Sequence, residues 1–286
     1  MRAESGVLYI VGTPLGNLED ISQRAVRILQ EVDLIAAEDT RRTRNLLTAL
    51  GIKTPMISYH RHNEKSRSEL LVKKMQAGQS VALVSDGGMP GISDPGEALV
   101  QAAVAADLRV VPIPGPVAAV SALVISGLST ERFAFEGFLP RLGRARQERL
   151  KELAAEKRTM LVYEAPHRLL RTLTDLYQAL GDRAAAVARE LTKVHEECIR
   201  GTLRSLIEHF EENEPRGECA IVIAGLDSGT SVDSVTMTDE DIAALLRSRV
   251  QKGLTPSDAA RAVAAETGWP RRRVYQISLS LFPGDR

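Results

Sequence analysis

Side chains that can exchange protons gather in two short stretches near the start of the chain. Glu38 and Asp39 form one pair, and His60, His62 and Glu64 lie further along. Carboxylates and imidazoles are the usual groups for taking a proton from a reacting hydroxyl. We therefore select Asp39, His62 and Glu64 as candidate catalytic residues.

Helix capping and metal binding are the alternatives to catalysis for these residues. Asp39 lies just before an expected helix and Glu64 in the first turn of another, where carboxylates stabilise free N–H groups. His60 and His62 could suggest a metal, but a site normally needs three ligands in fixed geometry and the spacing offers no third. We expect no bound metal, and both the catalytic and the capping interpretations stay open.

Three loops rich in glycine and proline each follow a short apolar run. The loops are Gly12–Asn17, Ser85–Gly91 and Pro114–Pro116, after the runs 7–11, 81–84 and 110–113. In an open α/β sheet such loops form the ligand crevice, although any one of them alone could be an ordinary turn. Neither Gly-x-Gly-x-x-Gly nor Gly-Lys-Ser/Thr occurs in them, and prolines remove N–H donors that a phosphate needs. Together they predict one shared small-molecule site.

The composition restricts the class of protein. The chain has 286 residues, 44% of them apolar, and 37 basic residues balance 37 acidic ones. Nucleic-acid binding would therefore need local basic patches. Two cysteines, Cys198 and Cys219, argue against a disulfide framework. We expect no signal peptide, no membrane span and a cytoplasmic location.

Alternating strand-like and helix-like runs predict two α/β domains. Residues 1–128 should form a mostly parallel sheet covered by helices, including a helix Ile21–Leu29 capped by Asp20. Residues 129–226 should form a second α/β domain, and the small polar residues 227–236 a linker.

Residues 237–286 are expected to be helical. Thr238 is a suitable helix cap, and Pro256–Thr267, a turn at Gly268 and Arg271–Leu281 have the outline of a helix-turn-helix. Arg271, Arg272 and Arg273 begin its second helix, where a recognition helix meets nucleic acid. A small helical cap with a basic end is the alternative.

The order and spacing of several motifs resemble the tetrapyrrole methylase superfamily. The matching blocks are Tyr9–Leu18, Ala37–Arg41, His62–Glu64, Leu83–Pro90, Asp94–Gly96, Pro114–Pro116, Glu136–Pro140, Tyr163–Arg168 and Ala188–Lys193. The resemblance implies S-adenosylmethionine bound between two α/β domains, and usually a homodimer. The chain is most similar to the small-subunit methyltransferase I branch. That branch methylates the ribose 2′-oxygen of a cytidine in the decoding region of small-subunit (16S) ribosomal RNA, free or in the assembled subunit.

The resemblance also implies which residues face the cofactor. They are Pro14, Asp86, Gly87, Gly88, Val117, Ala118, Tyr163, Leu191, Glu218, Cys219 and Ala220. Val117 and Ala118 depart from the hydroxyl pair of the tetrapyrrole branch, and they could equally be core residues at a helix start.

An RNA substrate would need phosphate contacts. Residues 141–158 contain seven basic and three acidic residues, which favours a phosphate track over the usual solvated helix face because they follow the Glu136–Pro140 block. The candidate RNA-binding residues are Arg41, Arg42, Arg144, Arg146, Arg168, Arg271, Arg272 and Arg273. Two alternatives stay open: a methyltransferase of a tetrapyrrole precursor, and a non-catalytic nucleic-acid-binding ligand sensor.

Overall fold

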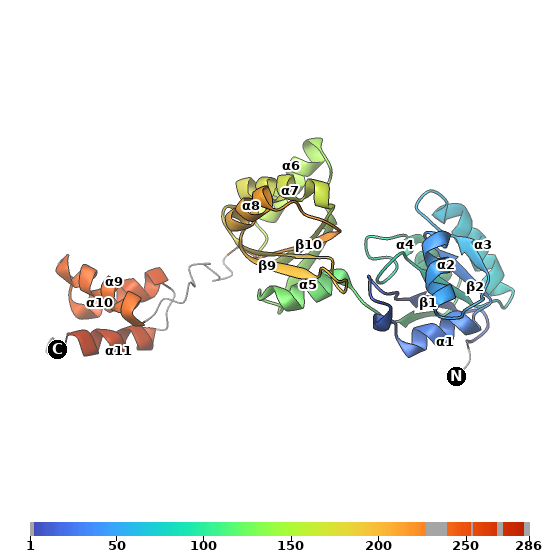
Figure 1. Cartoon of the computed structure of the whole chain (residues 1–286), viewed down its shortest axis with the longest axis horizontal. Helices are drawn as coiled ribbons and strands as arrows, with labels where there is room; N and C mark the ends of the chain where they lie inside the picture. Colours follow the sequence, from blue (N-terminus) through green and yellow to red (C-terminus); the bar gives the residue numbers. More distant parts are fainter. Residues whose placement is uncertain (1–2, 227–238, 253, 268–270, 283–286) are drawn as a thin grey trace. The chain divides into compact units, whose positions relative to one another are not determined.

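The first sheet has five parallel strands in the order β3-β2-β4-β1-β5. In this computed structural model residues 3–226, 239–252, 254–267 and 271–282 are described (Figure 1). The strands are β1 Leu8–Val11, β2 Leu34–Ala37, β3 Met56–Ser58, β4 Val81–Val84 and β5 Val110–Ile113. The parallel sheet confirms the prediction from the alternating pattern.

Helices cover both faces of this sheet because its strands are apolar on both sides. Helices α1 (Gln23–Glu31) and α2 (Thr40–Ala49) pack on one face, against Tyr9 and Val11 of β1. Helices α3 (Glu64–Gln76) and α4 (Glu97–Ala105) pack on the other, against Leu8 and Ile10. Because the five strands are parallel, their carboxyl ends all lie at one edge of the sheet.

The predicted start of α1 was wrong by two residues. Ser22 caps this helix by accepting a hydrogen bond from the Ala25 N–H at 3.1 Å, whereas Asp20 belongs to a separate 3-10 turn, η1 (Leu18–Asp20). Asn17 caps that turn, and Asp20 is the last residue of the turn. Asp20 therefore lies in the element before α1 and does not cap α1.

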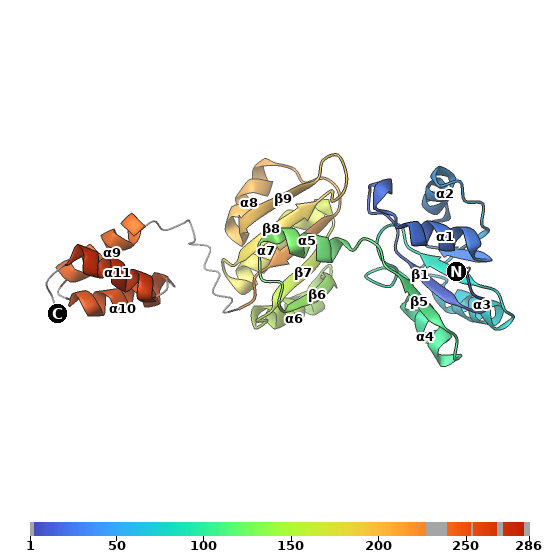
Figure 2. The ribbon, with the colours of Figure 1, turned by 90° about the horizontal axis from the view of Figure 1, so that it is seen from below.

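The second sheet is mixed, with the order β6-β7-β10-β8-β9 (Figure 2). Its strands are β6 Phe133–Phe138, β7 Thr159–Glu164, β8 Ala184–Arg189, β9 Glu197–Thr202 and β10 Cys219–Ile223. Only β6 and β7 pair in parallel among these strands. We had not predicted β9, because this edge strand lacks a buried apolar run.

Helices on the two faces of the second sheet come from different parts of the chain. Helices α6 (Gly143–Ala154), α7 (Pro166–Leu180) and α8 (Leu203–Glu212) pack on one face. Helix α5 (Ala118–Ser126) packs on the other through Ala119, Ala122 and Leu123. Thus α5 lies on the second sheet although it precedes residue 129.

The last three described helices form a compact unit of their own. Helices α9 (Asp239–Gln251), α10 (Pro256–Thr267) and α11 (Arg271–Leu281) enclose a small core that includes Leu246, Val263 and Val274. The helix ranges agree with the sequence prediction. The expected linker, Thr238, the turn at residues 268–270 and the side chains of Arg271 and Arg272 lie outside the described residues. Among the described helices, none has the length and apolar character that crossing a membrane requires.

Candidate active site

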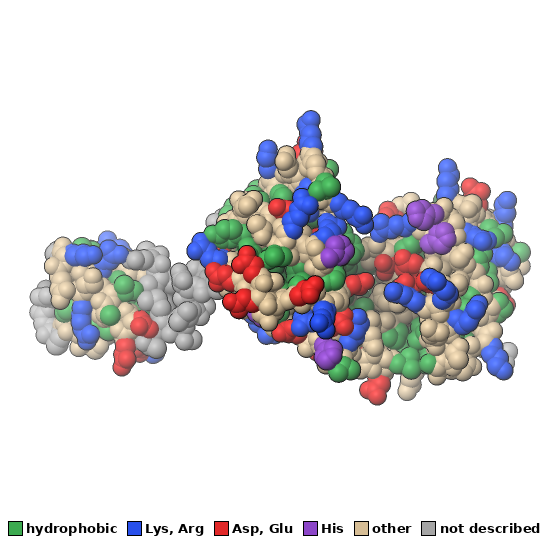
Figure 3. Space-filling view, turned by 45° about the horizontal axis from the view of Figure 1, so that its top comes forward, with side chains coloured by type: hydrophobic (Ala, Val, Ile, Leu, Met, Phe, Trp, Pro, Cys, Tyr) green, Lys and Arg blue, Asp and Glu red, His purple; other side chains and the backbone are tan. Residues whose placement is uncertain are grey.

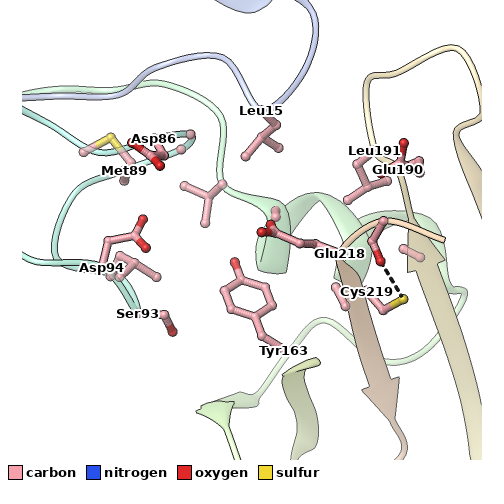
Figure 4. A pocket seen from close by; sticks show the side chains of 18 of the residues that line it. Leu15, Asp86, Met89, Ser93, Asp94, Tyr163, Glu190, Leu191, Glu218 and Cys219 are labelled. Carbon is pink, nitrogen blue, oxygen red and sulfur yellow. Dashed lines mark hydrogen bonds between the residues drawn. The ribbon is translucent and has the colours of Figure 1, made fainter. Parts of the chain in front are cut away.

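A cavity of about 410 Å³ is lined by residues of both sheets in the unit 1–226 (Figure 4). Its walls come from the loop after β4, the start of α5, the ends of β6, β7 and β8, and the start of β10. This volume falls in the usual range of small-molecule sites, about 300–1,000 Å³.

The three glycine- and proline-rich loops meet at this edge of the first sheet. Thr13 and Gly88 exchange two backbone hydrogen bonds, of 3.0 and 2.9 Å. Gly12 and Gly115 approach so closely that a Cβ on Gly12 would lie 2.7 Å from the Gly115 Cα. The three loops therefore lie in contact, as the prediction of a shared site requires, and the close approach explains why glycine is needed there.

The lining is rich in carboxylates. Six acidic residues line the cavity, namely Glu38, Asp86, Asp94, Glu164, Glu190 and Glu218, against two basic residues, Arg42 and Lys193. Each basic side chain is already paired, Arg42 with Asp86 at 3.3 Å and Lys193 with Glu190 at 2.8 Å. The cavity therefore suits a positively charged ligand group.

Asp94 has an unusual environment among these carboxylates. Burial raises its pKa to about 6, the charges of Glu38 and Glu218 add to the rise, and a hydrogen bond from Ser85 opposes it. Burial also raises the pKa of Glu38. Figure 4 shows the Asp94 side chain on the side of the cavity opposite Glu218. A carboxylate with a pKa near 6 is an effective proton acceptor at neutral pH.

Apolar and aromatic side chains complete the lining. Val117 and Ala118 begin α5, and Leu191 and Ala220 face them from the second sheet. The Tyr163 hydroxyl accepts a hydrogen bond from the Ala119 N–H at 2.9 Å, which fixes the ring at the start of α5. Burial raises the pKa of Tyr163, so its hydroxyl stays protonated.

The predicted cofactor residues gather at this cavity, with one exception. Asp86, Gly87, Gly88, Val117, Ala118, Tyr163, Leu191, Glu218, Cys219 and Ala220 all line it. Pro14 is the exception; its carbonyl would lie 3.2 Å from a Cβ on Gly87, while the next residue, Leu15, is in the lining. Their roles toward a cofactor stay predictions.

The predicted catalytic residues lie outside the lining. Asp39 caps α2, and hydrogen bonds from the Arg41 side chain and backbone lower its pKa to about 2. Glu64 is the first residue of α3, and His62 is exposed with its ring 6.0 Å from that of His60. Among the described residues no cluster of three or more metal-ligating side chains occurs. The capping interpretation accounts for Asp39.

Asp94 is not among the site residues predicted from the sequence, although it lies in the Asp94–Gly96 motif. The available signal was its place in the same loop as Asp86, at the carboxyl end of β4. Its distinguishing feature is the raised pKa, which depends on residues such as Glu38 and Glu218 that are distant in the sequence.

The predicted RNA-binding arginines separate into exposed and buried groups. The side chains of Arg41, Arg42 and Arg144 are 88%, 69% and 90% exposed. In the helical unit Arg273 is 58% exposed and pairs with Asp239 at 3.0 Å. Figure 3 shows acidic side chains in the hollow of the unit 1–226, with Lys and Arg side chains around it.

Arg146 does not belong to a phosphate-binding surface, which corrects the prediction. Its side chain is 5% exposed, and its guanidinium donates to Asp175 at 2.7 Å and to Thr172 and the Pro140 carbonyl at 2.9 Å. Arg168 is also largely covered, at 20% exposed, and pairs with Glu164 at 3.2 Å. Arg146 thus joins α6 to α7, and Arg168 joins α7 to the end of β7.

The family of the chain follows from comparison with known proteins. The tetrapyrrole (corrin/porphyrin) methylase model matches residues 7–207, and the RsmI C-terminal HTH domain matches residues 236–282. The "Ribosomal RNA small subunit methyltransferase I" of Synechocystis is 55% identical over 277 residues, covering 96% of this chain and 98% of that protein. The chain belongs to this methyltransferase family.

Two further relatives differ in how much of this chain they match. The Halalkalibacterium halodurans protein of the same name is 43% identical over 278 residues, 96% of each chain. The Thermotoga maritima protein of that name is 48% identical over 220 residues, which cover 99% of it but 77% of this chain. A family member therefore exists at about the length of the unit 1–226.

Solved structures of lower identity share the fold. A cobalt precorrin-4 methyltransferase superimposes with a TM-score of 0.57 at 17% identity, covering 77% of this chain and 95% of that one. A uroporphyrin-III C-methyltransferase from Thermus thermophilus, complexed with S-adenosylhomocysteine, gives 0.55 at 20% identity, covering 80% and 99%.

Proposed function

We propose that this protein is an S-adenosylmethionine-dependent methyltransferase of small-subunit ribosomal RNA. Its target in this proposal is the ribose 2′-oxygen of a cytidine in the decoding region. The observation that carries the proposal is the 55% identity, over nearly the full length of both chains, to a protein named for that activity. A ribosomal substrate also implies a cytoplasmic site of action.

The cavity has the size and charge that the methyl donor needs. When bound, S-adenosylmethionine supplies a methyl group on a positively charged sulfur. In our proposal Asp86, Gly87 and Gly88 hold its methionine part, with Val117 and Ala118 beside it. Tyr163, Leu191 and the segment Glu218-Cys219-Ala220 close the site from the second sheet. The acidic lining favours the cationic donor and opposes a polycarboxylate tetrapyrrole as substrate.

We assign the proton acceptor to Asp94. A ribose hydroxyl is a weak acid, so a base should take its proton as the oxygen is methylated. Asp94 lines the cavity and has a pKa of about 6, whereas Asp39 lies outside it with a pKa of about 2. The Asp94 carboxylate would hold the proton at an oxygen, while Tyr163 keeps its own proton and orients the start of α5.

We propose that the exposed arginines bind RNA phosphates, Arg41 and Arg144 outside the cavity lining and Arg42, which belongs to the lining, at its exposed edge. Arg41 and Arg42 begin α2, and Arg144 lies in the first turn of α6. Arg273 and its neighbours would add contacts from the helical tail. The Thermotoga maritima relative matches over 220 residues, about the length of the unit 1–226, so we assign the tail to RNA affinity rather than to methyl transfer.

We also propose that the protein is a homodimer. Val120 and Val124 lie one turn apart on α5, are 44% and 68% exposed, and point away from the residues that pack on the second sheet. Light scattering on the purified protein tests this: a mass of twice the 31.2 kDa chain supports it, and a monomer mass contradicts it.

The proposed activity is tested by transfer of labelled methyl from S-adenosylmethionine to small ribosomal subunits from cells that lack this gene. The RNA is then digested and its nucleosides are identified by mass spectrometry. A new 2′-O-methylcytidine supports the proposal. Donor binding without labelled RNA, from subunits or from free RNA, contradicts it.

A further inference from the structure

Two large apolar side chains at the cavity are exposed. Ile92 is 43% exposed and Phe138 is 49% exposed, and both belong to the lining. They come from different sheets, Ile92 from the loop after β4 and Phe138 from the end of β6. A ligand that covers these two side chains would remove apolar surface from water, which favours binding.

A β-bulge turns Phe138 toward the cavity. Strands β6 and β7 pair Phe135 with Leu161, but one residue is skipped before Gly137 pairs with Val162 and Phe138 with Tyr163. Because side chains alternate along a strand, the extra residue moves Phe138 to the face that carries Tyr163. The two ring centroids are 5.7 Å apart. Without the bulge, glycine would occupy that position.

The backbone of the bulge is specialised for this role. Gly137 has a φ of +62°, which side chains other than glycine adopt at a cost. A Cβ on Gly137 would lie 3.3 Å from the Ser93 hydroxyl, so β6 approaches the loop that carries Ile92 and Asp94. Phe138 and Asp94 therefore follow two residues that lie close together, Gly137 and Ser93, and both line the cavity.

Basic residues follow Phe138 in the chain, and another is bound to the neighbouring loop. Arg61 donates a hydrogen bond to the Ser93 carbonyl, on the loop that meets Gly137. Arg141 and Arg144 follow Phe138 closely in the chain, and both are exposed. An exposed aromatic face flanked by arginines is the usual arrangement for stacking an unpaired base while its phosphates are bound.

We infer that Phe138 is the stacking platform for the base of the target nucleotide. This inference rests on the proposed function. The base leaves the RNA stack and lies on the Phe138 ring, and its ribose then faces Asp94 and the donor. The role differs from methyl-donor binding, because Phe138 would contact the RNA and not the donor.

Substitutions at Phe138 separate RNA binding from donor binding. Phe138→Ala should lower kcat/KM for small subunits about 5- to 100-fold, while calorimetry should give a Kd for S-adenosylmethionine within about twofold of wild type. Phe138→Leu keeps apolar volume without a ring face, so it should show most of the same loss. Phe138→Trp should recover to within about threefold of wild type.

Phe133→Ala is the matched control. Phe133 lies on the same strand and is 42% exposed, but it is not in the lining, so its loss should change kcat/KM less than about twofold. Equal rates for Phe138→Ala and Phe133→Ala would overturn the inference, as would full activity of Phe138→Leu or an equal loss of donor affinity. A wild-type enzyme that methylates no RNA would instead overturn the proposed function itself.

Discussion

The interior of the cavity and the surface around it carry opposite charge. Six carboxylates and two paired cations line the interior, whereas Arg41 and Arg144 extend at the starts of α2 and α6 with side-chain exposures of 88% and 90%. The difference explains how a chain with zero net charge can serve a cationic donor and a polyanionic substrate. Each ligand binds where the local charge is opposite to its own, and the net charge of the whole chain predicts neither binding site.

Removal of the Asp94 carboxylate should have the largest effect on the interior. We expect Asp94→Asn to lower the methyl-transfer rate about 10²- to 10⁴-fold, because the amide cannot accept the ribose proton. Single-turnover transfer to small subunits measures this loss. In the wild type the rate should rise with pH up to about 6 and then level off, following the Asp94 pKa. An unchanged rate in the variant would assign the proton to another group.

Two arginines of α6 sharpen the contrast between buried and exposed charge. Arg146→Ala leaves Asp175 and Thr172 without their partner, so we expect the free energy of unfolding to fall by about 3 kcal/mol. Arg144→Ala removes only an exposed pair with Glu148, and its effect should stay within about 0.5 kcal/mol. Urea denaturation of both variants makes the measurement. A similar loss of unfolding free energy in both variants would mean that burial does not determine how much each arginine stabilises the fold.

Glu218 tests whether the acidic lining holds the donor. Glu218→Gln keeps the shape of the side chain but removes one negative charge, so S-adenosylmethionine should bind about three- to tenfold more weakly. Glu214→Gln is the matched control, since Glu214 is exposed in the same connection and is absent from the lining. Calorimetry should detect a change only at Glu218. Equal affinities for the two variants would remove Glu218 from the donor site.

The raised pKa of Asp94 also predicts a pH-dependent stability. The folded state holds the Asp94 proton up to about pH 6, whereas the unfolded chain releases it near pH 4. The unfolded state therefore binds fewer protons between these values, and this residue makes the fold less stable as the pH rises. Asp94→Asn should be more stable than wild type at pH 7, on the order of 1 kcal/mol, and equal to it below pH 4. Thermal melts at both pH values check this, and a pH-independent difference would argue against the shift.

Much of this architecture could be predicted where local sequence decides it. Apolar runs followed by glycine and proline located β1, β4 and β5 of the first sheet and the edge at which the loops meet. Motif order then selected residues as distant as Asp86 and Cys219, which share one cavity.

Other features depend on tertiary context that spacing cannot reveal. Strand β9 forms because β8 offers it an edge, although its own residues are only half-buried. Arg146 looks like any other arginine in a basic run until Asp175 and Thr172 surround it. The pKa of Asp94 is likewise set by burial and by carboxylates from distant elements.

The opposite charge of interior and surface is tested most directly by the salt dependence of both binding equilibria. The affinity for S-adenosylmethionine and the KM for small subunits are measured on the same preparation between 50 and 200 mM salt, a range of about fourfold. As the salt concentration rises, we predict that RNA binding weakens at least about tenfold. Donor binding should change less than about threefold, because salt screens partly buried charges less than exposed ones. Equal salt dependence of the two ligands would contradict a separate acidic interior and basic surface.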